Sequence, residues 1–264
     1  MTRWLPIVVI MLWCLASLSL TVLHIEHETI YLEKILAVPG WDAWLGYDEL
    51  GRSVAKRLLA GARVSFFIAI SVVSISFFIG TIIGISSAWL GGWWDRLMIM
   101  IMDLFMAFPG ILLAIVLAGL LGPGISNAVI ALSVVGWVGF ARLARAQTLS
   151  IKQRDHVQAA RALGTSTTRI ALRHILPLLT APLLVQITFE LAGTIIAEST
   201  LSFLGIGVQP PDASWGSMIR DGMRYMLIAP HVVLAPGVAI FLVVMSINMF
   251  GDRLRDRLDV RIKH

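Results

Sequence analysis

The sequence predicts an all-α membrane protein with about six transmembrane helices. Of its 264 residues, 58% are hydrophobic and only 14% are charged, whereas soluble domains carry about a quarter charged residues. The charges lie between long apolar runs, and a run of about 18 or more apolar residues is long enough to cross a bilayer. Both observations argue against a water-soluble fold.

Six uncharged or nearly uncharged runs predict the helices in order. They cover residues 5–23, 64–90, 97–121, 126–147, 175–200 and 229–251. The stretch 97–141 is too long for one helix, so Gly122, Pro123 and Gly124 are expected to reverse the chain. Pro109 is expected to kink the third helix, because proline lacks the amide hydrogen of the helical ladder.

The distribution of basic residues predicts the orientation. Six crossings place both termini on one side, which holds 14 of the 21 lysine and arginine residues. Because basic residues are preferentially retained in cytoplasmic segments, both termini are expected in the cytoplasm. Three parts follow: residues 1–63 contain the first helix and an external loop, residues 64–251 form a five-helix core with an internal loop at 149–176, and residues 252–264 form a charged tail.

Composition and motifs argue against several functions. The pI is about 9.9, but the basic residues flank apolar runs instead of gathering on one aqueous face, so nucleic acid is not an expected partner. Cys14 is the single cysteine, and the six histidines show no metal-ligand spacing backed by a carboxylate, so no metal or other cofactor is expected in this chain. No glycine-rich loop ends in Gly-Lys-Ser/Thr, so nucleotide hydrolysis is expected in another chain.

The internal loop contains the most informative segment, DHVQAARALG, which begins at Asp155. Asp155 and Gln158 have the spacing of a capping box, and Gly164 is a natural helix terminator, so a short helix is expected. A second short helix is expected after it, ending where Pro177 opens the fifth transmembrane helix. The loop should therefore form a helix, a turn and a helix.

The first of these helices has two interpretations. Ala160 and Gly164 are four residues apart and share one helical face, where small residues let another protein approach the backbone closely. This pattern is typical of a docking surface. A solvated amphipathic helix on the membrane surface is the alternative, and composition alone favours it.

A family resemblance favours the docking interpretation. The run Gln158-Ala-Ala-Arg-Ala-Leu-Gly164, followed by Ile175-Leu-Pro177, resembles the "EAA" loop of binding-protein-dependent ABC importer permeases. In that family the loop forms a coupling helix that fits a cleft in the ATP-binding subunit. Gln158 stands where the family usually has glutamate. The resemblance assigns the coupling helix to Asp155, Gln158, Ala159, Ala160, Leu163, Gly164 and Pro177.

Three further stretches are similar to the dipeptide, oligopeptide and nickel permeases, in particular their "C"-type subunit. The first is GYDELGRSV and the residues up to Ser65, with Tyr47 and Ser53 departing from the family pattern. The second is ESTLSFLGIG, which begins at Glu198, with the Pro210-Pro211 pair after it. The third is NMFGDRLRD near the C-terminus.

The resemblance implies a type I ABC importer transmembrane domain in the bacterial inner membrane, without catalytic residues of its own. Its implied partners are a homologous second permease, two ABC ATPase subunits that bind ATP and Mg²⁺, a periplasmic substrate-binding protein and the surrounding lipid. Its implied cargo is a dipeptide, an oligopeptide or a nickel complex. Residues 64–251 would form the permease core, with the coupling loop at 149–176.

Acidic residues within the expected helices are candidates for a translocation path, because an ionised carboxylate at mid-bilayer costs about 3 kcal/mol or more. Glu190 lies near the middle of the fifth helix and either binds a cargo amine or a cation, or makes an interhelical contact. Glu198 is the second candidate, but its position near the helix end favours a cap for the following loop. Asp103 is expected to reach water or Arg96.

Two other function classes remain open. An ion channel or ion-coupled carrier would use the intramembrane acids Glu190 and Asp103 and would need no ATPase. An intramembrane protease would use Ser86 or Ser87 as its nucleophile. The sequence GISSA around these serines lies late in an expected membrane helix and has no paired histidine to act as a base. The favoured interpretation of this segment is therefore a set of small residues at a contact between helices.

Overall fold

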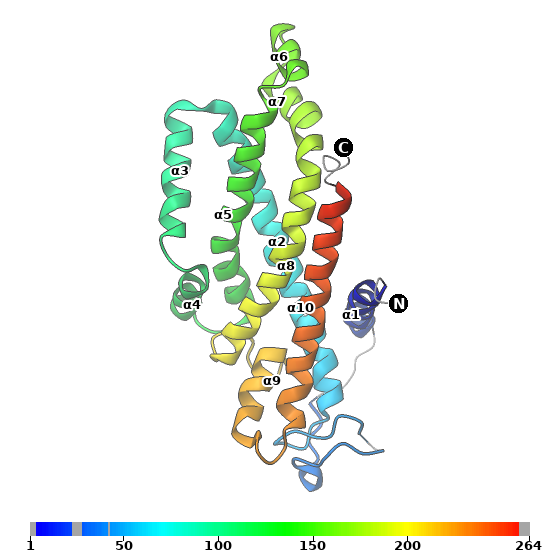
Figure 1. Ribbon diagram of the computed structural model, residues 1–264. Helices are drawn as coiled ribbons and strands as arrows, with labels where there is room; N and C mark the ends of the chain where they lie inside the picture. Colours follow the sequence, from blue (N-terminus) through cyan, green and yellow to red (C-terminus); the bar gives the residue numbers. More distant parts are fainter. Residues whose placement is uncertain (1–3, 23–27, 42, 259–264) are drawn as a thin grey trace.

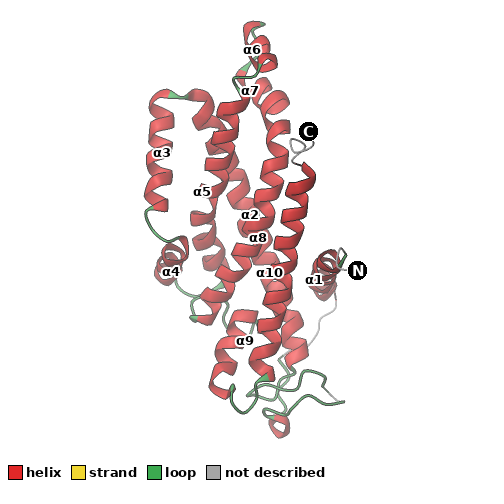
Figure 2. Cartoon of the chain, viewed as in Figure 1, coloured by secondary structure: helices red, strands yellow, loops and turns green. Residues whose placement is uncertain are grey.

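The computed structural model describes residues 4–22, 28–41 and 43–258, and these form helices joined by loops, with no β-strand among them (Figure 2). The longer helices are α1 (Leu5–Val22), α2 (Val54–Leu90), α3 (Gly92–Met106), α4 (Gly110–Leu121), α5 (Ile125–Ile151), α8 (Leu176–Phe203) and α10 (His231–Leu258). The shorter helices are α6 (Asp155–Ala162), α7 (Thr167–Ile170) and α9 (Trp215–Gly222). The all-α fold class is therefore confirmed.

The helices α2, α5, α8 and α10 run side by side between two distinct ends of the molecule (Figure 1). α6 and α7 stand at one end, called here the α6 end, and α9 lies with residues 28–53 at the opposite end, called the α9 end (Figure 1). α1 is seen almost end-on in the same view. It crosses the bundle instead of running along it, and it packs against α2 and α10.

Four helices within the described residues are long and apolar enough to cross a membrane. They are α2, α5, α10 and the continuous helix Thr167–Phe203, which includes α7 and α8. α3 and α4 pass the same test only as a pair, which is bent by 86°. The apolar part of α1 is shorter, Leu5–Leu18. By length and composition the structure thus has four spans, or five with the bent pair, against the six expected.

The third expected helix is broken at Pro109, where a kink was expected. α3 ends at Met106 and α4 begins at Gly110, with Pro109 in the N-cap position of α4. Proline at this position needs no hydrogen-bond donor, because the first amides of a helix have no partner within it. The expectation of one kinked helix from residue 97 to residue 121 is therefore corrected to two helices meeting near a right angle.

α2 begins at Val54, whereas the sequence predicted a start at residue 64. Hydropathy placed the start after the last charged residue, but the charge of Arg57 is paired with Asp48. A helix of 37 residues is about 55 Å long, which exceeds the bilayer core of about 30 Å. The first turns of α2 are therefore stabilised by neighbouring loops at the α9 end, and the expected division after residue 63 falls inside this helix.

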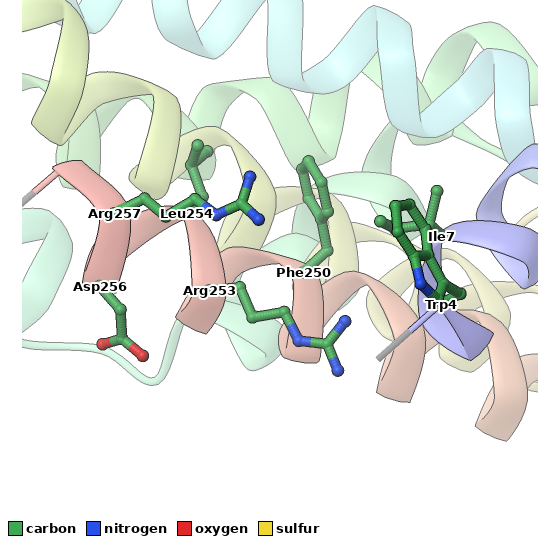
Figure 3. Close-up of a pocket in the computed structure, with 7 residues that line it drawn as sticks. All are labelled: Trp4, Ile7, Phe250, Arg253, Leu254, Asp256 and Arg257. Carbon is green, nitrogen blue, oxygen red and sulfur yellow. The ribbon is translucent and has the colours of Figure 1, made fainter. Parts of the chain in front are cut away.

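The expected charged tail begins as a continuation of α10. This helix extends to Leu258, and residues 259–264 lie outside the described part of the chain. Its last turns and the start of α1 enclose a cavity of about 640 Å³ (Figure 3). The residues that line it are Trp4, Ile7, Phe250, Arg253, Leu254, Asp256 and Arg257.

The packing of α2 against α5 depends on two glycines of α2. A Cβ atom on Gly80 would lie 2.3 Å from the carbonyl oxygen of Trp137, and one on Gly84 would lie 2.3 Å from the carbonyl oxygen of Ala141. Both distances are shorter than any normal contact. Glycines four residues apart therefore let the two backbones touch, as in membrane helix pairs with small residues at the contact.

At the α9 end, the loop before α2 is organised around the buried carboxylate of Asp48, which is 1% exposed. Asp48 accepts hydrogen bonds from the backbone amides of Leu50 and Arg52 at 2.9 and 2.8 Å. It also forms ion pairs with Arg52 at 2.7 Å and with Arg57 at 2.6 Å. The GYDELGRSV stretch is therefore a structural motif that connects this loop to the start of α2.

Replacing Asp48 with alanine is expected to destabilise the protein by about 3–5 kcal/mol, because it leaves the buried charge of Arg57 without its closest partner. Thermal unfolding of the purified protein in detergent measures this effect. Asp212→Ala, at an exposed position of the same end, is the control and should stay within about 0.5 kcal/mol of the unmodified protein. Equal melting temperatures for the two variants would contradict the proposed role of Asp48.

Candidate functional site

The segment DHVQAARALG forms α6, which projects beyond the ends of α5 and α8 at the α6 end (Figure 1). A turn follows it, and α7 begins at Thr167. The expected helix, turn and helix are therefore confirmed. The projection places most of α6 outside the bundle, where a second protein can reach it.

Gly164 ends α6 in the conformation that the sequence predicted. Its φ is +76°, a left-handed value that glycine adopts without steric cost. Its amide donates to the carbonyl of Arg161 at 3.0 Å, and the amide of Thr165 donates to the carbonyl of Ala160 at 3.1 Å. This pair of hydrogen bonds is the Schellman motif that commonly terminates helices.

The start of α6 differs from the expected capping box. Asp155 is the first helical residue, and Arg154 occupies the N-cap position without a side-chain cap. The Gln158 side chain donates instead to the carbonyl of Lys152 at 3.4 Å. The acidic group of Asp155 in the first turn still favours the helix, because a negative charge there complements the helix dipole.

The exposed face of α6 differs from the expected face as well. Ala160 is half-buried and packs into an apolar cluster formed with α5 and α8, so Ala160 and Gly164 do not form one docking face. The small exposed residues are Ala159 and Ala162. They adjoin Leu163, which is 86% exposed. An exposed leucine next to two alanines forms a small apolar surface at the tip of the molecule.

α7 continues into the membrane helix without the break that was expected at Pro177. The π-helical turn Ala171–Ile175 joins α7 to α8, and Pro177 is the second residue of α8. A wider π turn accommodates a proline that cannot donate to the preceding turn. The segment Thr167–Phe203 is consequently one continuous helix.

A polar cluster that the sequence analysis missed supports the base of α6. Asp95 at the start of α3 pairs with Arg145 of α5 through two hydrogen bonds of 2.7 and 2.8 Å. Ser87 also donates to Asp95, and the ammonium of Lys152 donates to the carbonyl of Ala88 at 2.7 Å. The sequence showed only that Asp95 and Arg145 lie near the ends of expected helices. This signal does not identify them as partners, because they are 50 positions apart.

Three residues considered for other functions make local contacts. Ser86 donates to the carbonyl of Ile83 within α2 at 3.0 Å and accepts from the indole of Trp94 of α3 at 3.3 Å, and Ser87 donates to Asp95 of α3, so both serines take part in the contact between α2 and α3. Asp103 is exposed, in agreement with one of its two expected environments, and its ion-pair partner is Arg142, at 3.8 Å, and not Arg96. Both side chains of this pair are more than half exposed, so the pair contributes little to stability.

No metal site is evident in the part of the chain that the structure describes. His156 of α6 and His174 face one another with ring centroids 6.0 Å apart. No group of three histidine, cysteine, aspartate or glutamate side chains gathers there or elsewhere among the described residues. Two histidines alone do not complete the ligand sets that zinc requires in proteins.

Glu198 is enclosed by hydroxyl groups. Its carboxylate accepts hydrogen bonds from Ser65 of α2 at 3.0 Å and from Ser202 at 2.8 Å, and Ser199 and Ser214 also contribute. The residue is only 1% exposed. These contacts connect α2, α8 and the loop before α9, which favours a structural role over a place in an open path.

Glu190 has different surroundings. It is half-buried near the middle of α8 and lines a cavity of about 270 Å³ between α4, α5 and α8. Its carboxylate accepts a hydrogen bond from the side chain of Gln186, one turn before it. Of the two acids in α8, Glu190 is therefore the one that a solute in this cavity can contact.

Comparisons with known proteins agree with this architecture. Residues 80–264 match the family described as "Binding-protein-dependent transport system inner membrane component". The chain is 44% identical over 225 residues to the glutathione transport system permease protein GsiD of Escherichia coli O6:K15:H31 (strain 536 / UPEC), covering 85% of this chain and 74% of that protein. GsiD of Shigella boydii serotype 4 (strain Sb227) gives the same values.

Two solved structures of the MetNI methionine ABC transporter, both in inward-facing conformations, share the fold. One has a TM-score of 0.62 at 20% identity and covers 76% of this chain and 96% of the other. The second has a TM-score of 0.60 at 18% identity, with 78% and 95% covered. The chain therefore belongs to the binding-protein-dependent transport system inner membrane component family and is a permease component of an ABC importer in the inner membrane.

Proposed function

We propose that this chain is a non-catalytic permease subunit that carries a peptide-type cargo inward, driven by ATP hydrolysis in separate subunits that dock on α6. The single observation that carries the proposal is the position of α6, which projects from the bundle and presents a small apolar surface at its tip (Figure 1). The α6 end then lies in the cytoplasm, together with both chain termini, as the distribution of basic residues predicts.

The coupling surface consists of Ala159, Ala162 and Leu163 beside the terminator Gly164. Small side chains allow close approach of another backbone, and burial of the exposed Leu163 side chain against a partner would remove apolar surface from water. Asp155 and Gln158 add polar contacts at its edge. A position of α6 flat on the membrane surface is disfavoured. α6 lies beyond the end of the bundle, in the direction of the long axis of the bundle (Figure 1).

The connection from α6 to the membrane explains how a partner's movement is transmitted. The cluster around Ala160 holds α6 against α5 and α8, and Thr167–Phe203 continues from the docking region into the membrane as one helix. A displacement of α6 that is passed on to α7 therefore moves Glu190, which lies on the helix Thr167–Phe203. Rigid movement of one bundle around a central site is the usual basis of alternating access.

The remaining partners follow from the importer class. Two ATPase subunits would bind ATP and Mg²⁺, a homologous and distinct second permease would complete the path, and a periplasmic binding protein would deliver cargo to the α9 end. GsiD is named a glutathione transport permease, so we propose glutathione or another short peptide as cargo. The chain itself would bind no cofactor.

The experiment is purification of the complex in mild detergent from its native membrane, followed by reconstitution into liposomes. We expect two permeases and two ATPases to copurify. With the binding protein added outside, reduced glutathione or alanine di- and tripeptides should accumulate inside only when ATP is supplied to the ATPases. ATP-independent accumulation by the purified chain alone would contradict the proposal and would favour an ion-coupled carrier that uses Glu190.

A further inference from the structure

The cavity that contains Glu190 is lined by small or apolar side chains from three helices. Its lining residues include Gly110 and Ala114 of α4, Gly136 of α5, and Gly193 and Thr194 of α8. Among the residues that the structure describes, Glu190 is the only ionisable one that lines it. A single carboxylate in an apolar, membrane-embedded cavity is a functional-site candidate, because its charge is costly there without a partner.

The carboxylate of Glu190 has no cationic partner within the described part of the chain, where the ion pairs involve other acids. Gln186 provides a hydrogen bond, but an amide carries no charge. The contrast with Glu198 is direct, because four serine hydroxyls surround that carboxylate. Glu190 is therefore left with capacity to accept hydrogen bonds from a solute.

Two other observations indicate a polar ligand at this position. The hydroxyl of Ser76 on α2 is buried and lacks a hydrogen-bond partner. A Cβ atom on Gly136 would lie 2.6 Å from this hydroxyl oxygen and 3.2 Å from Oε1 of Glu190. A side chain at Gly136 would therefore contact both oxygen groups, and the glycine leaves room between them in a place where hydrocarbon would leave them unsatisfied.

The break in the membrane segment lies at the same cavity. Gly110, the first residue of α4 after the 86° bend, is part of its lining. Irregular backbone at membrane depth is tolerated only where it is buried in protein or lines a cavity. Broken membrane helices commonly mark the substrate site of a transporter. The geometry of α4 therefore points to this cavity independently of Glu190.

We propose that Glu190 binds the positively charged amino group of the cargo as it passes through the membrane. This inference rests on the proposed function as a peptide-type permease. An ammonium group donates up to three hydrogen bonds, which the two oxygens of Glu190 and a hydroxyl can accept. A divalent cation is a poorer fit, because Ca²⁺ takes six to eight oxygen ligands. A cavity of about 270 Å³ accommodates the amino end of a peptide.

The test measures cargo binding to the complete membrane complex in lipid nanodiscs, without the binding protein. Radiolabelled reduced glutathione and alanine tripeptide are the probes, with their N-acetylated forms as matched ligands that lack the charge. Glu190→Gln is expected to raise the Kd of the amine-bearing probes at least about tenfold, the loss typical of a charge-assisted hydrogen bond. The N-acetylated probes should bind both complexes equally weakly.

A second variant tests the cavity without altering the carboxylate. A Cβ atom on Gly193 would meet no atom within 4 Å, so Gly193→Leu fills the cavity without a backbone clash and should weaken probe binding. A Cβ atom on Gly237 of α10 would likewise meet no atom within 4 Å, and Gly237→Leu is the matched control. It should leave binding unchanged.

The outcomes separate this inference from the proposed function. An unchanged Kd in Glu190→Gln, or equal binding of acetylated and free peptides to the unmodified complex, would overturn the ammonium site while ATP-driven uptake persists. Loss of ATP dependence in the unmodified complex would overturn the proposed function instead. Binding of both probe types reduced equally in Glu190→Gln would assign Glu190 a structural role and reject the inference.

Discussion

Replacing Gly164 with aspartate is expected to reduce ATP-driven cargo uptake at least about tenfold while the permease still inserts and folds. Gly164 follows the proposed docking helix, and a Cβ atom there meets nothing within 4 Å in this chain. The fold therefore has space for a side chain at Gly164, and aspartate is one of the few residues that adopt such a positive φ, but a docked subunit would bury an unpaired charge. That burial costs several kcal/mol, and each 1.4 kcal/mol corresponds to a factor of ten.

The measurement is cargo uptake and ATP hydrolysis by the reconstituted complex, compared for Gly164→Asp and Gly164→Asn. Both side chains have the same shape and are among the best tolerated at the positive φ of +76°. The asparagine variant should retain most of the uptake, because only the charge differs. Uptake by the aspartate variant equal to that of the unmodified complex would reject docking at this end of α6.

Replacing Gly84 with alanine is expected to destabilise the folded permease by about 1–3 kcal/mol or more. The new methyl group would lie 2.3 Å from the carbonyl oxygen of Ala141 and 2.8 Å from Cβ of Ala144, so α2 and α5 must separate. Overpacking of this kind typically costs 1–3 kcal/mol. α2 and α5 share the most extensive helix contact among the described residues, so the displacement affects the whole bundle.

Thermal unfolding in detergent measures this effect, with Gly119→Ala as the matched control. A Cβ atom on Gly119 of α4 meets nothing within 4 Å. In water-exposed helices alanine is favoured over glycine by about 1 kcal/mol, so helix propensity alone would stabilise both variants. A lower melting temperature for Gly84→Ala together with an unchanged or higher one for Gly119→Ala assigns the loss to packing. Equal melting temperatures would refute it.

The internal loop at residues 149–176 shows which features of a structure local sequence signals can predict. Gly164 predicted the end of α6, because a left-handed terminator is a local requirement of the backbone. The inward position of Ala160 was not predictable, since it depends on an apolar cluster that includes residues of α2, α5 and α8. A helical repeat shows which residues share a face, but it does not show which face the rest of the protein covers.

The two intramembrane acids illustrate the same limit. Both were candidates for the path, because hydropathy reports only that a charge lies within an apolar run. The structure separates them by contacts that join distant positions: Ser65 lies 133 residues before Glu198, whereas Glu190 faces a cavity between three helices. The position of Glu198 near the helix end favoured a structural cap, but sequence spacing does not identify the serines that enclose Glu198 or the cavity that Glu190 faces.

The start of α2 and the bend after α3 have comparable origins. The charged residues before residue 64 led to an expected start of α2 that is too late in the sequence. The charge of Arg57 is accommodated within the helix because it pairs with Asp48, and hydropathy does not report such a tertiary contact. Pro109 indicated a disturbed helix, but the angle of 86° is set by the packing of α4 against α5.

The sequence by itself determined that the chain forms membrane-spanning helices, although not their number or exact bounds. It also determined the helical internal loop with its glycine terminator and the resemblance to importer permeases, because hydropathy, helix signals and motifs are properties of neighbouring residues. Only the tertiary structure decided which face of α6 is exposed, which acid is enclosed and which acid lines a cavity. These properties depend on packing between residues far apart in the chain, where partners, burial and hydrogen bonds are set by the assembled bundle.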